Sequence, residues 1–213
     1  MTRSFHYFSE QRILIISLIG FMGCGKSSVG RRLSQLLCCP FIDLDDVIEE
    51  REGRTISEIF AAEGEAGFRE IELESLLTVV EGGCSKTEQH CHPERSEGSS
   101  HLILALGGGT VMTPQCAALV MEKTLCIYLK ASVDTLMERL APDNESRPLL
   151  CPYASPSMQG EETSPVEDLL LRNRIEHLLS QRSAIYEKTA NIIIDTDGKS
   201  IDQICSEILG LNH

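Results

Sequence analysis

Hydrophobic residues in this chain form short unbroken runs, and these runs alternate with longer stretches that have helical spacing. The five runs are 13–19 (ILIISLI), 41–43 (FID), 102–106 (LILAL), 126–129 (CIYL) and 191–195 (NIIID). Short apolar runs without alternation are typical of parallel strands that are buried on both faces. Strands that alternate with helices, joined by right-handed crossovers, predict a three-layer α/β fold with a five-stranded parallel sheet.

Turn and capping residues predict where several helices begin and end. The helix opened by residues 43–46 should stop at Gly53, and the capping box Thr55 to Glu58 should start a short helix through Ala62. The glycines of 64–67 then predict a break before a helix over 68–80.

Further along the chain, helix starts are expected at three more places. Pro114 suits a first helical turn capped by Thr113, and residues 132–134 and 200–203 also have N-capping patterns. A long helical stretch is predicted over 169–190.

Two polar segments interrupt this pattern. Residues 82–101 are rich in Gly and Ser and predict an insertion loop, while residues 142–168 surround Arg147 with Pro, Ser, Asn and acidic residues and predict a surface excursion. A chain of 213 residues can fill one α/β core, so we expect a single domain over 1–213.

The strongest chemical signal is Gly20-x-x-x-x-Gly25-Lys26-Ser27, directly after the first apolar run. Glycines let backbone N–H groups turn toward a polyphosphate, and the following helix adds the positive end of its dipole. Lys26 can reach the β- and γ-phosphates, and Ser27 can bind Mg²⁺. The alternative is a plain glycine-rich turn, but strand, full motif and amphipathic helix occur in the order that favours nucleotide binding. The residues expected to contact ATP are Gly23, Cys24, Gly25, Lys26, Ser27 and Ser28.

Other unusual residues follow predicted strands, and ligands bind at the carboxyl ends of strands in open parallel sheets. Asp43 is placed to hold Mg²⁺ together with Ser27. Asp45 could accept a substrate hydroxyl proton, but Asp45 and Asp46 could equally serve as N-caps, and spacing alone leaves both readings open. The three glycines 107–109 allow a ligand to approach the backbone.

Charge and cysteine content narrow the class of protein. With 19 Lys+Arg and 32 Asp+Glu the net charge is −13, which disfavours nucleic acid or an anionic membrane as partner. Residues 1–12 lack an apolar core, and no apolar run reaches the ~18 residues of a membrane span. We therefore expect a cytoplasmic protein whose nine cysteines are thiols. Cys84 with His90 and His92 suggests zinc, but no second ligand pair at structural-site spacing supports it.

Taken together and in order, the motifs of this chain resemble those of the shikimate kinase family. The segments are GFMGCGKSSVG, FIDLDDVIE, GRTISEIF, GEAGFREIE, ALGGGTV, SRPLL and QRSAIYEKTA. The resemblance covers roughly 13–210 outside the two polar segments. It implies a P-loop kinase fold with a lid over 142–168, and transfer of phosphate from MgATP to the 3-hydroxyl of shikimate in the route to chorismate and the aromatic amino acids. Shikimate and ATP are the expected partners, and we expect a monomer.

The resemblance also implies roles for individual residues. Asp45 would hold the substrate hydroxyls and act as base, and Gly108 would contact the substrate through its backbone. Arg69 and Arg182 would clamp the shikimate carboxylate with their guanidinium groups. Arg147, in the lid, would close over ATP and act in catalysis with Lys26.

Four further observations bear on these roles. Arg69 could instead form an ordinary surface pair with Glu65 or Glu72, and Arg147 could belong to a solvated face. Lys199 stands where the family often has an adenine-contacting Arg or Gln. The lid segment is longer than is usual in the family, so the sequence does not predict how fast the lid closes.

Two other functions fit the same phosphate loop. One is another small-molecule kinase, such as a gluconate kinase, and the second is a nucleotide-binding module without phosphoryl transfer. Lys26, Asp43, Asp45 and Arg147 together argue against an inactive protein.

Overall fold

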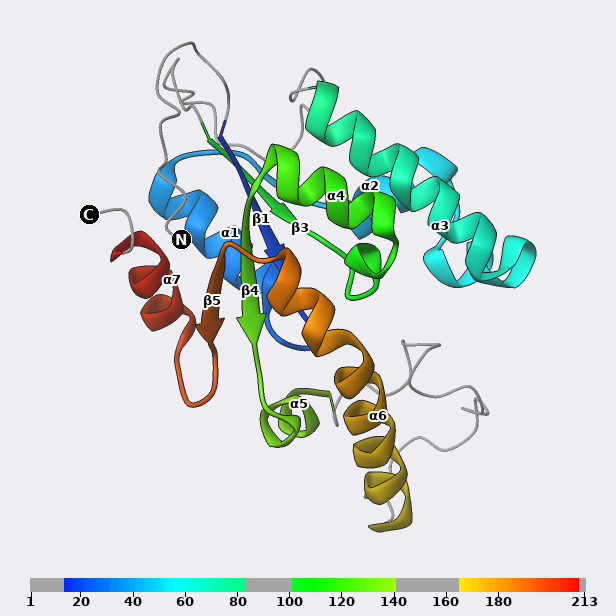
Figure 1. The fold of residues 1–213 in the computed structure, drawn as a ribbon, viewed down its shortest axis with the longest axis vertical. Coiled ribbons are helices and arrows are strands. Elements are labelled where there is room, and N and C mark those ends of the chain that lie inside the picture. The colour runs from blue at the N-terminus through cyan, green and yellow to red at the C-terminus, as the bar shows by residue number, and fades with distance from the viewer. Residues whose placement is uncertain (1–13, 83–100, 141–164, 211–213) are drawn as a thin grey trace.

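The computed structural model describes residues 14–82, 101–140 and 165–210. Its centre is one sheet of five parallel strands in the order β2-β3-β1-β4-β5 (Figure 1). The strands are β1 (Leu14–Ile19), β2 (Phe41–Asp43), β3 (His101–Ala105), β4 (Leu125–Lys130) and β5 (Ile192–Asp195). The predicted α/β fold with a five-stranded parallel sheet is therefore confirmed, with strand ends within one residue of the predicted runs wherever the chain is described.

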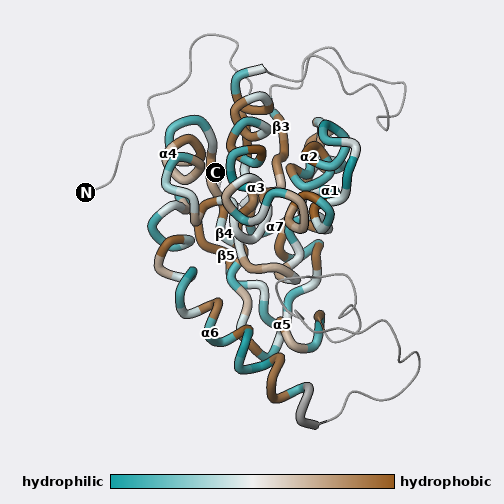
Figure 2. The backbone as a smooth tube through the Cα atoms, turned by 90° about the vertical axis from the view of Figure 1, so that its right-hand side faces the viewer, coloured by the Kyte–Doolittle hydropathy of each residue, from teal (hydrophilic) through white to brown (hydrophobic). Residues whose placement is uncertain are grey.

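Helices cover both faces of the sheet and make the outer two layers (Figures 1 and 2). They are α1 (Lys26–Leu37), α2 (Leu44–Glu52), α3 (Ile56–Gly82), α4 (Pro114–Lys123), α5 (Val133–Leu140), α6 (Pro165–Thr189) and α7 (Ile201–Gly210), with a 3₁₀ turn η1 (Thr110–Met112). Among the described residues, no helix is both long enough and apolar enough to cross a membrane.

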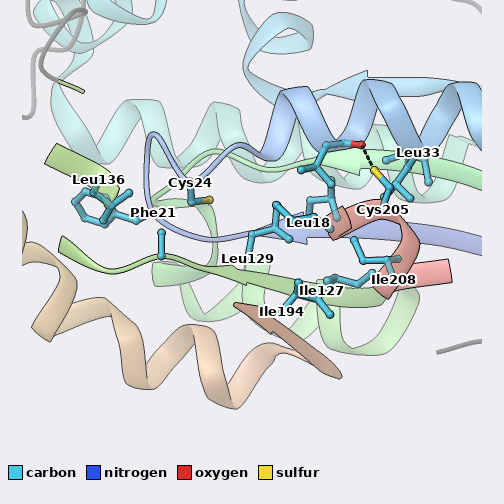
Figure 3. Packing of buried hydrophobic residues seen from close by; sticks show 14 of the residues in the cluster. Leu18, Phe21, Cys24, Leu33, Ile127, Leu129, Leu136, Ile194, Cys205 and Ile208 are labelled. Carbon is cyan, nitrogen blue, oxygen red and sulfur yellow. Dashed lines mark hydrogen bonds between the residues drawn. The ribbon is translucent and has the colours of Figure 1, made fainter. Parts of the chain in front are cut away.

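Each strand contributes side chains to two separate cores, because successive residues point to opposite faces. Leu18 packs with residues of α1 and α7 on one face, where Cys205 lies against the start of α1 (Figure 3). Ile15 and Ile19 pack with α2, α3 and α4 on the other face. Burial on both faces explains why the strands read as continuous apolar runs.

The break predicted at 64–67 is narrower in the structure. Helix α3 runs from Ile56 to Gly82 and is interrupted at Gly64, whose φ of 71° and ψ of −173° are not helical. The predicted break between two helical parts is therefore confirmed at Gly64, but the second part resumes at residue 65 and not at Phe68. Glycine tolerates a positive φ, so one residue absorbs the kink and the helix resumes at once. Phe68, Leu76 and Val79, which belong to the part after the kink, are buried against the sheet.

Most of the predicted helix starts are confirmed. In the capping box, Glu58 accepts from the Thr55 backbone N–H at 2.8 Å, and the Glu58 N–H donates to the Thr55 hydroxyl at 3.3 Å. Ser200 caps α7 through the Gln203 N–H at 3.3 Å. Thr113 occupies the N-cap position of α4, as predicted, although its side chain makes no capping hydrogen bond. Pro114 at the first helical position lacks an N–H that would have no partner within the helix.

The parallel strands place their carboxyl ends at one edge of the sheet. The phosphate loop follows β1, Asp43 ends β2, and the three glycines follow β3. His101, at the opposite end of β3, pairs with Leu14, so the predicted insertion 82–101 joins the sheet at the far edge from the loops. Residues 83–100 lie outside the described residues, as do Cys84, His90 and His92 of the zinc hypothesis. The same holds for 141–164, which include Arg147 and most of the predicted lid.

Candidate active site

A cavity of about 710 Å³ lies at the carboxyl edge of the sheet. Its walls come from the phosphate loop, the end of β2, helix α3, the three glycines after β3, helix α6 and the segment that leads into α7. The predicted site residues that line it are Gly23, Cys24, Gly25, Lys26, Ser27, Ser28, Asp43, Asp45, Arg69, Gly108, Arg182 and Lys199. Of the residues predicted from sequence, the structure thus brings together all but Arg147, which is not described.

The phosphate loop presents the N-terminus of α1 to this cavity. Gly25 occupies the N-cap position with a φ of 99°, and no side chain caps the helix there. The first-turn N–H groups, together with the helix dipole, make a suitable anion site. The Lys26 ammonium lies inside the loop and donates to the carbonyls of Gly20 and Phe21, both at 3.0 Å.

The side chains of Ser27 and Asp43 form a hydrogen bond in the cavity wall. The Ser27 hydroxyl donates to Asp43 Oδ2 at 2.6 Å, and Asp43 Oδ1 accepts the Asp45 N–H at 3.2 Å. Asp43 is thus the N-cap of α2, and Asp45 and Asp46 lie in its first turn. This arrangement decides the question that spacing left open: neither Asp45 nor Asp46 is the N-cap, so the Asp45 side chain is available to the cavity.

The donor set at Ser27 and Asp43 fits a magnesium ion. A hydroxyl and a carboxylate are hard oxygen ligands, and Mg²⁺ in phosphoryl-transfer sites takes few protein ligands because phosphate oxygens and waters supply the rest. No group of three or more His, Cys, Asp or Glu residues placed to hold a metal occurs in the part of the chain that is described. The two oxygens therefore suit an ion that arrives with a nucleotide.

Asp45 has an unusual environment for a carboxylate. Burial in the cavity wall raises its pKa to about 6, the neighbouring Asp43 charge adds to the increase, and Lys26 opposes it. Asp45 is consequently ionised at neutral pH while holding its proton more readily than an exposed aspartate. A carboxylate with such a pKa is well matched to accepting a hydroxyl proton near pH 7.

Arg69 is held by two carboxylates on its own helix. Its Nη1 donates to Glu72 Oε2 at 2.6 Å, and its Nη2 lies 3.4 Å from Glu65 Oε1. The alternative of an ordinary surface pair is correct only for Glu65. Glu72 is 1% exposed, and its second oxygen accepts from the Thr110 hydroxyl at 2.7 Å. Glu72 is therefore a buried, hydrogen-bonded support for the partly buried Arg69 guanidinium, which lines the cavity.

The three glycines are packed against functional side chains. A Cβ on Gly109 would lie 2.4 Å from Arg69 Nη2, and a Cβ on Gly107 would lie 2.9 Å from Asp45 Oδ1. The sequence pattern indicated only that something approaches this backbone. In the described structure, the approaching groups include the protein's own arginine and aspartate.

Arg182 reaches the cavity from α6, on the other side of the glycines. Its Nη1 donates to the Gly108 carbonyl at 3.4 Å, and its guanidinium carbon lies 5.9 Å from the centre of the Phe21 ring. Arg69 and Arg182 therefore both contact the glycine segment, one at Gly109 and the other at Gly108.

Some residues of the site were missed by sequence reasoning. Arg139, at the end of α5, lines the cavity and donates to the Cys24 carbonyl of the phosphate loop at 3.1 Å. In the sequence it is only a basic residue in a last helical turn, which is an ordinary position for a cation. Phe60 and Phe68 also line the cavity and stack with their ring centres 4.5 Å apart. Lys199, a predicted residue, forms an ion pair with Glu207 at 2.6 Å.

Comparison with known proteins assigns the family. The sequence profile described as "SKI: Shikimate kinase" matches residues 22–211. The chain belongs to the shikimate kinase family. Members of this family are kinases, so the chain is an enzyme that phosphorylates shikimate with ATP, as the motifs predicted.

Individual relatives agree with this assignment. The chain is similar to a shikimate kinase of Thioalkalivibrio sulfidiphilus, at 39% identity over 91% of this chain and 84% of the relative. It is also similar to one of Dictyoglomus turgidum, at 34% identity over 91% and 94%. A solved shikimate kinase of Acinetobacter baumannii, in complex with shikimate, matches with a TM-score of 0.70 and 28% identity over 95% and 94% of the two chains. One from Bacteroides thetaiotaomicron matches with a TM-score of 0.71 and 29% identity over 93% and 98%.

Proposed function

We propose that the chain transfers the γ-phosphoryl group of ATP to the 3-hydroxyl of shikimate, with the acceptor bound between α3 and α6. The observation that carries this proposal is that Asp45, Arg69 and Arg182 line the same cavity as Lys26. The phosphate loop supplies the donor half of the site, and the other three residues supply a carboxylate and two guanidinium groups for the acceptor half.

Shikimate is a ring that carries hydroxyl groups and one carboxylate, and the acceptor half suits each part. Arg69 and Arg182 bind the carboxylate, because guanidinium groups match its two oxygens. The stacked rings of Phe60 and Phe68 give an apolar wall for the carbon ring. Asp45 accepts a hydrogen bond from the hydroxyl and takes its proton as the phosphorus–oxygen bond forms. Gly108 is proposed to contact the substrate through its backbone, as the family resemblance implies.

The donor half acts by charge and position. The N–H groups of residues 23–28 bind the phosphates, and Lys26 turns from the loop carbonyls to the transferred group. Ser27 and Asp43 would hold the Mg²⁺, which when bound neutralises phosphate charge and fixes the geometry of the triphosphate. Arg139 borders the phosphate loop, and Lys199 is proposed to contact adenine.

The remaining roles rest on the family resemblance. Arg147 is proposed to close over ATP as part of a lid over 142–168 and to neutralise developing charge, with 82–101 as an insertion in a single domain. We further propose that the enzyme is monomeric and cytoplasmic, and that its partners are limited to its small-molecule substrates. An acidic chain with a net charge of −13 supports the absence of nucleic acid and anionic membranes among them.

Product analysis tests the reaction. Purified chain is incubated with MgATP and shikimate, with MgATP and gluconate, and with MgATP alone, and ADP and phosphorylated products are measured. We expect shikimate 3-phosphate and shikimate-stimulated ADP release. Phosphorylated gluconate would point to the other kinase class, and ADP release that shikimate leaves unchanged would point to a binding module.

Replacing Arg69 tests the acceptor half. Arg69→Ala should raise the shikimate KM sharply and leave ATP affinity nearly unchanged, because Arg69 contacts the acceptor side of the cavity only. Steady-state kinetics with each substrate varied in turn measures both effects. Arg51→Ala, which removes an exposed ion pair with Glu74, is the control. An equal loss of affinity for shikimate and ATP would contradict the assignment of Arg69.

A further inference from the structure

Tyr186 hydrogen-bonds to the glycine segment without lining the cavity. Its hydroxyl donates to the carbonyl of Gly108, the middle glycine, yet Tyr186 is absent from the cavity wall. The side chain is fully buried, and burial raises the pKa of its hydroxyl well above the ordinary value. The hydroxyl is therefore protonated at neutral pH, and it can serve as a donor to the carbonyl throughout the working range.

The Gly108 carbonyl joins Tyr186 to Arg182. A carbonyl oxygen has two lone pairs, and here one accepts from the tyrosine hydroxyl and the other from Arg182 Nη1 at 3.4 Å. Arg182 and Tyr186 are four residues apart on α6, so they lie on the same face of the helix. The Arg182 contact is near the long limit of a hydrogen bond, so the tyrosine hydroxyl is the main restraint on the direction of the carbonyl.

Gly108 and its neighbour Gly109 also lie beside other parts of the site. A Cβ on Gly108 would lie 3.2 Å from the Met22 N–H nitrogen of the phosphate loop, and the adjacent Gly109 packs on the Arg69 guanidinium. A rotation of the Gly108 peptide would therefore displace the surfaces against which both arginines rest. No other hydrogen bond to the Gly108 carbonyl occurs among the described residues.

From these contacts we propose that Tyr186 is a positioning residue for the acceptor half of the site: its hydroxyl fixes the Gly108 carbonyl and thereby orients Arg182 toward the shikimate carboxylate. This inference rests on the acceptor role of Arg182 proposed above. It adds a residue that contacts neither substrate nor the reacting atoms and acts through the backbone of the glycine segment.

The structure offers a matched control in Tyr128 of β4. Its ring lies against that of Tyr186, with centroids 5.1 Å apart, and it is equally buried at 1% exposure. Its hydroxyl has no hydrogen-bond partner within the described part of the chain. Tyr128→Phe and Tyr186→Phe each remove one hydroxyl from the same aromatic pair, so they differ in the contacts of the Tyr186 hydroxyl with the Gly108 carbonyl and with the Arg182 side chain.

Steady-state kinetics of these two variants tests the proposal. Tyr186→Phe should raise the shikimate KM about three- to tenfold, as expected for one lost hydrogen bond to a buried acceptor, and leave the ATP KM unchanged. Tyr128→Phe should leave both constants unchanged. Equal rises in both KM values, equal effects of the two variants, or no effect of Tyr186→Phe in a folded protein would each overturn the proposal.

A double-mutant cycle separates positioning from general loosening of the fold. If Tyr186 acts through Arg182, then Tyr186→Phe should have almost no further effect on shikimate kcat/KM in an Arg182→Ala background. Effects that multiply would mean that the two residues act independently, which would overturn the proposal. Failure of the proposed reaction itself is distinguishable, because the unmodified chain and Tyr128→Phe would then also lack shikimate-dependent activity.

Discussion

Substituting Gly109 offers a test of the Arg69 position that leaves the arginine itself in place. The backbone at Gly109 has a φ of −109° and a ψ of −9°, which alanine adopts without strain. The new Cβ would however lie 2.4 Å from Arg69 Nη2, 2.9 Å from Nη1 and 3.0 Å from Cζ. Gly109→Ala therefore acts on the guanidinium and not on the local backbone conformation.

The size of the effect follows from these distances. Ordinary contact begins at 3.4 Å, so the guanidinium must retreat by about 1 Å. Glu72 holds it from behind at 2.6 Å and is itself buried, which leaves the movement little room. A misplacement of about 1 Å in a substrate-positioning group costs about 100-fold in rate, so kcat/KM for shikimate should fall by about that factor. ATP binding should be unaffected.

Kinetics with shikimate and ATP varied separately measures this loss, and Gly210→Ala, where a Cβ meets no atom within 4 Å, is the control. The double variant Arg69→Ala with Gly109→Ala removes the steric conflict, so it should be no worse than Arg69→Ala alone. A folded Gly109→Ala enzyme with normal kcat/KM for shikimate would refute the reasoning, as would an additional loss in the double variant.

Three further outcomes are expected. Asp45 gains its proton as the pH falls through its pKa of about 6, so kcat/KM for shikimate should drop about tenfold per pH unit below that value. In a pH profile, Asp45→Asn should show a low rate that lacks this decrease at acid pH. Ser27→Ala should raise the Mg²⁺ concentration needed for half-maximal rate about tenfold, because a hydroxyl ligand is lost. An unchanged half-maximal Mg²⁺ concentration would contradict the role of Ser27. Gly30→Ala places a Cβ 2.4 Å from Phe41 Cε2. The overpacking cost exceeds the gain in helix propensity, so the free energy of unfolding should fall by about 1–2 kcal/mol. Urea denaturation that shows no loss of stability would contradict this packing argument.

Much of the site could be predicted from sequence because its parts are local motifs. The phosphate loop needs its glycines, lysine and serine at set spacing, and the six consecutive residues predicted there to contact ATP, 23–28, all line the cavity. Asp43 and Asp45 follow a strand, and the sheet rule alone brings strand ends to one edge. For Asp45 the local pattern could not choose between capping and chemistry; the Asp43 hydrogen bond to the Asp45 N–H made that choice.

The break before Phe68 shows a limit of local signals. Two glycines close together predict the end of a helix, yet only Gly64 leaves the helical conformation. Packing of the residues after the kink against the sheet outweighs the low helix propensity of Gly67.

By itself, then, the sequence determined the order of strands and helices, the phosphate loop and the family, because apolar periodicity and motif spacing are local properties of the chain. The tertiary structure decided the supports of the site: Glu72 behind Arg69, Arg139 beside the phosphate loop and Tyr186 on the Gly108 carbonyl. Of these, the contacts of Arg139 and Tyr186 join residues 115 and 78 positions apart, and no local pattern encodes which distant groups a fold brings within hydrogen-bonding distance.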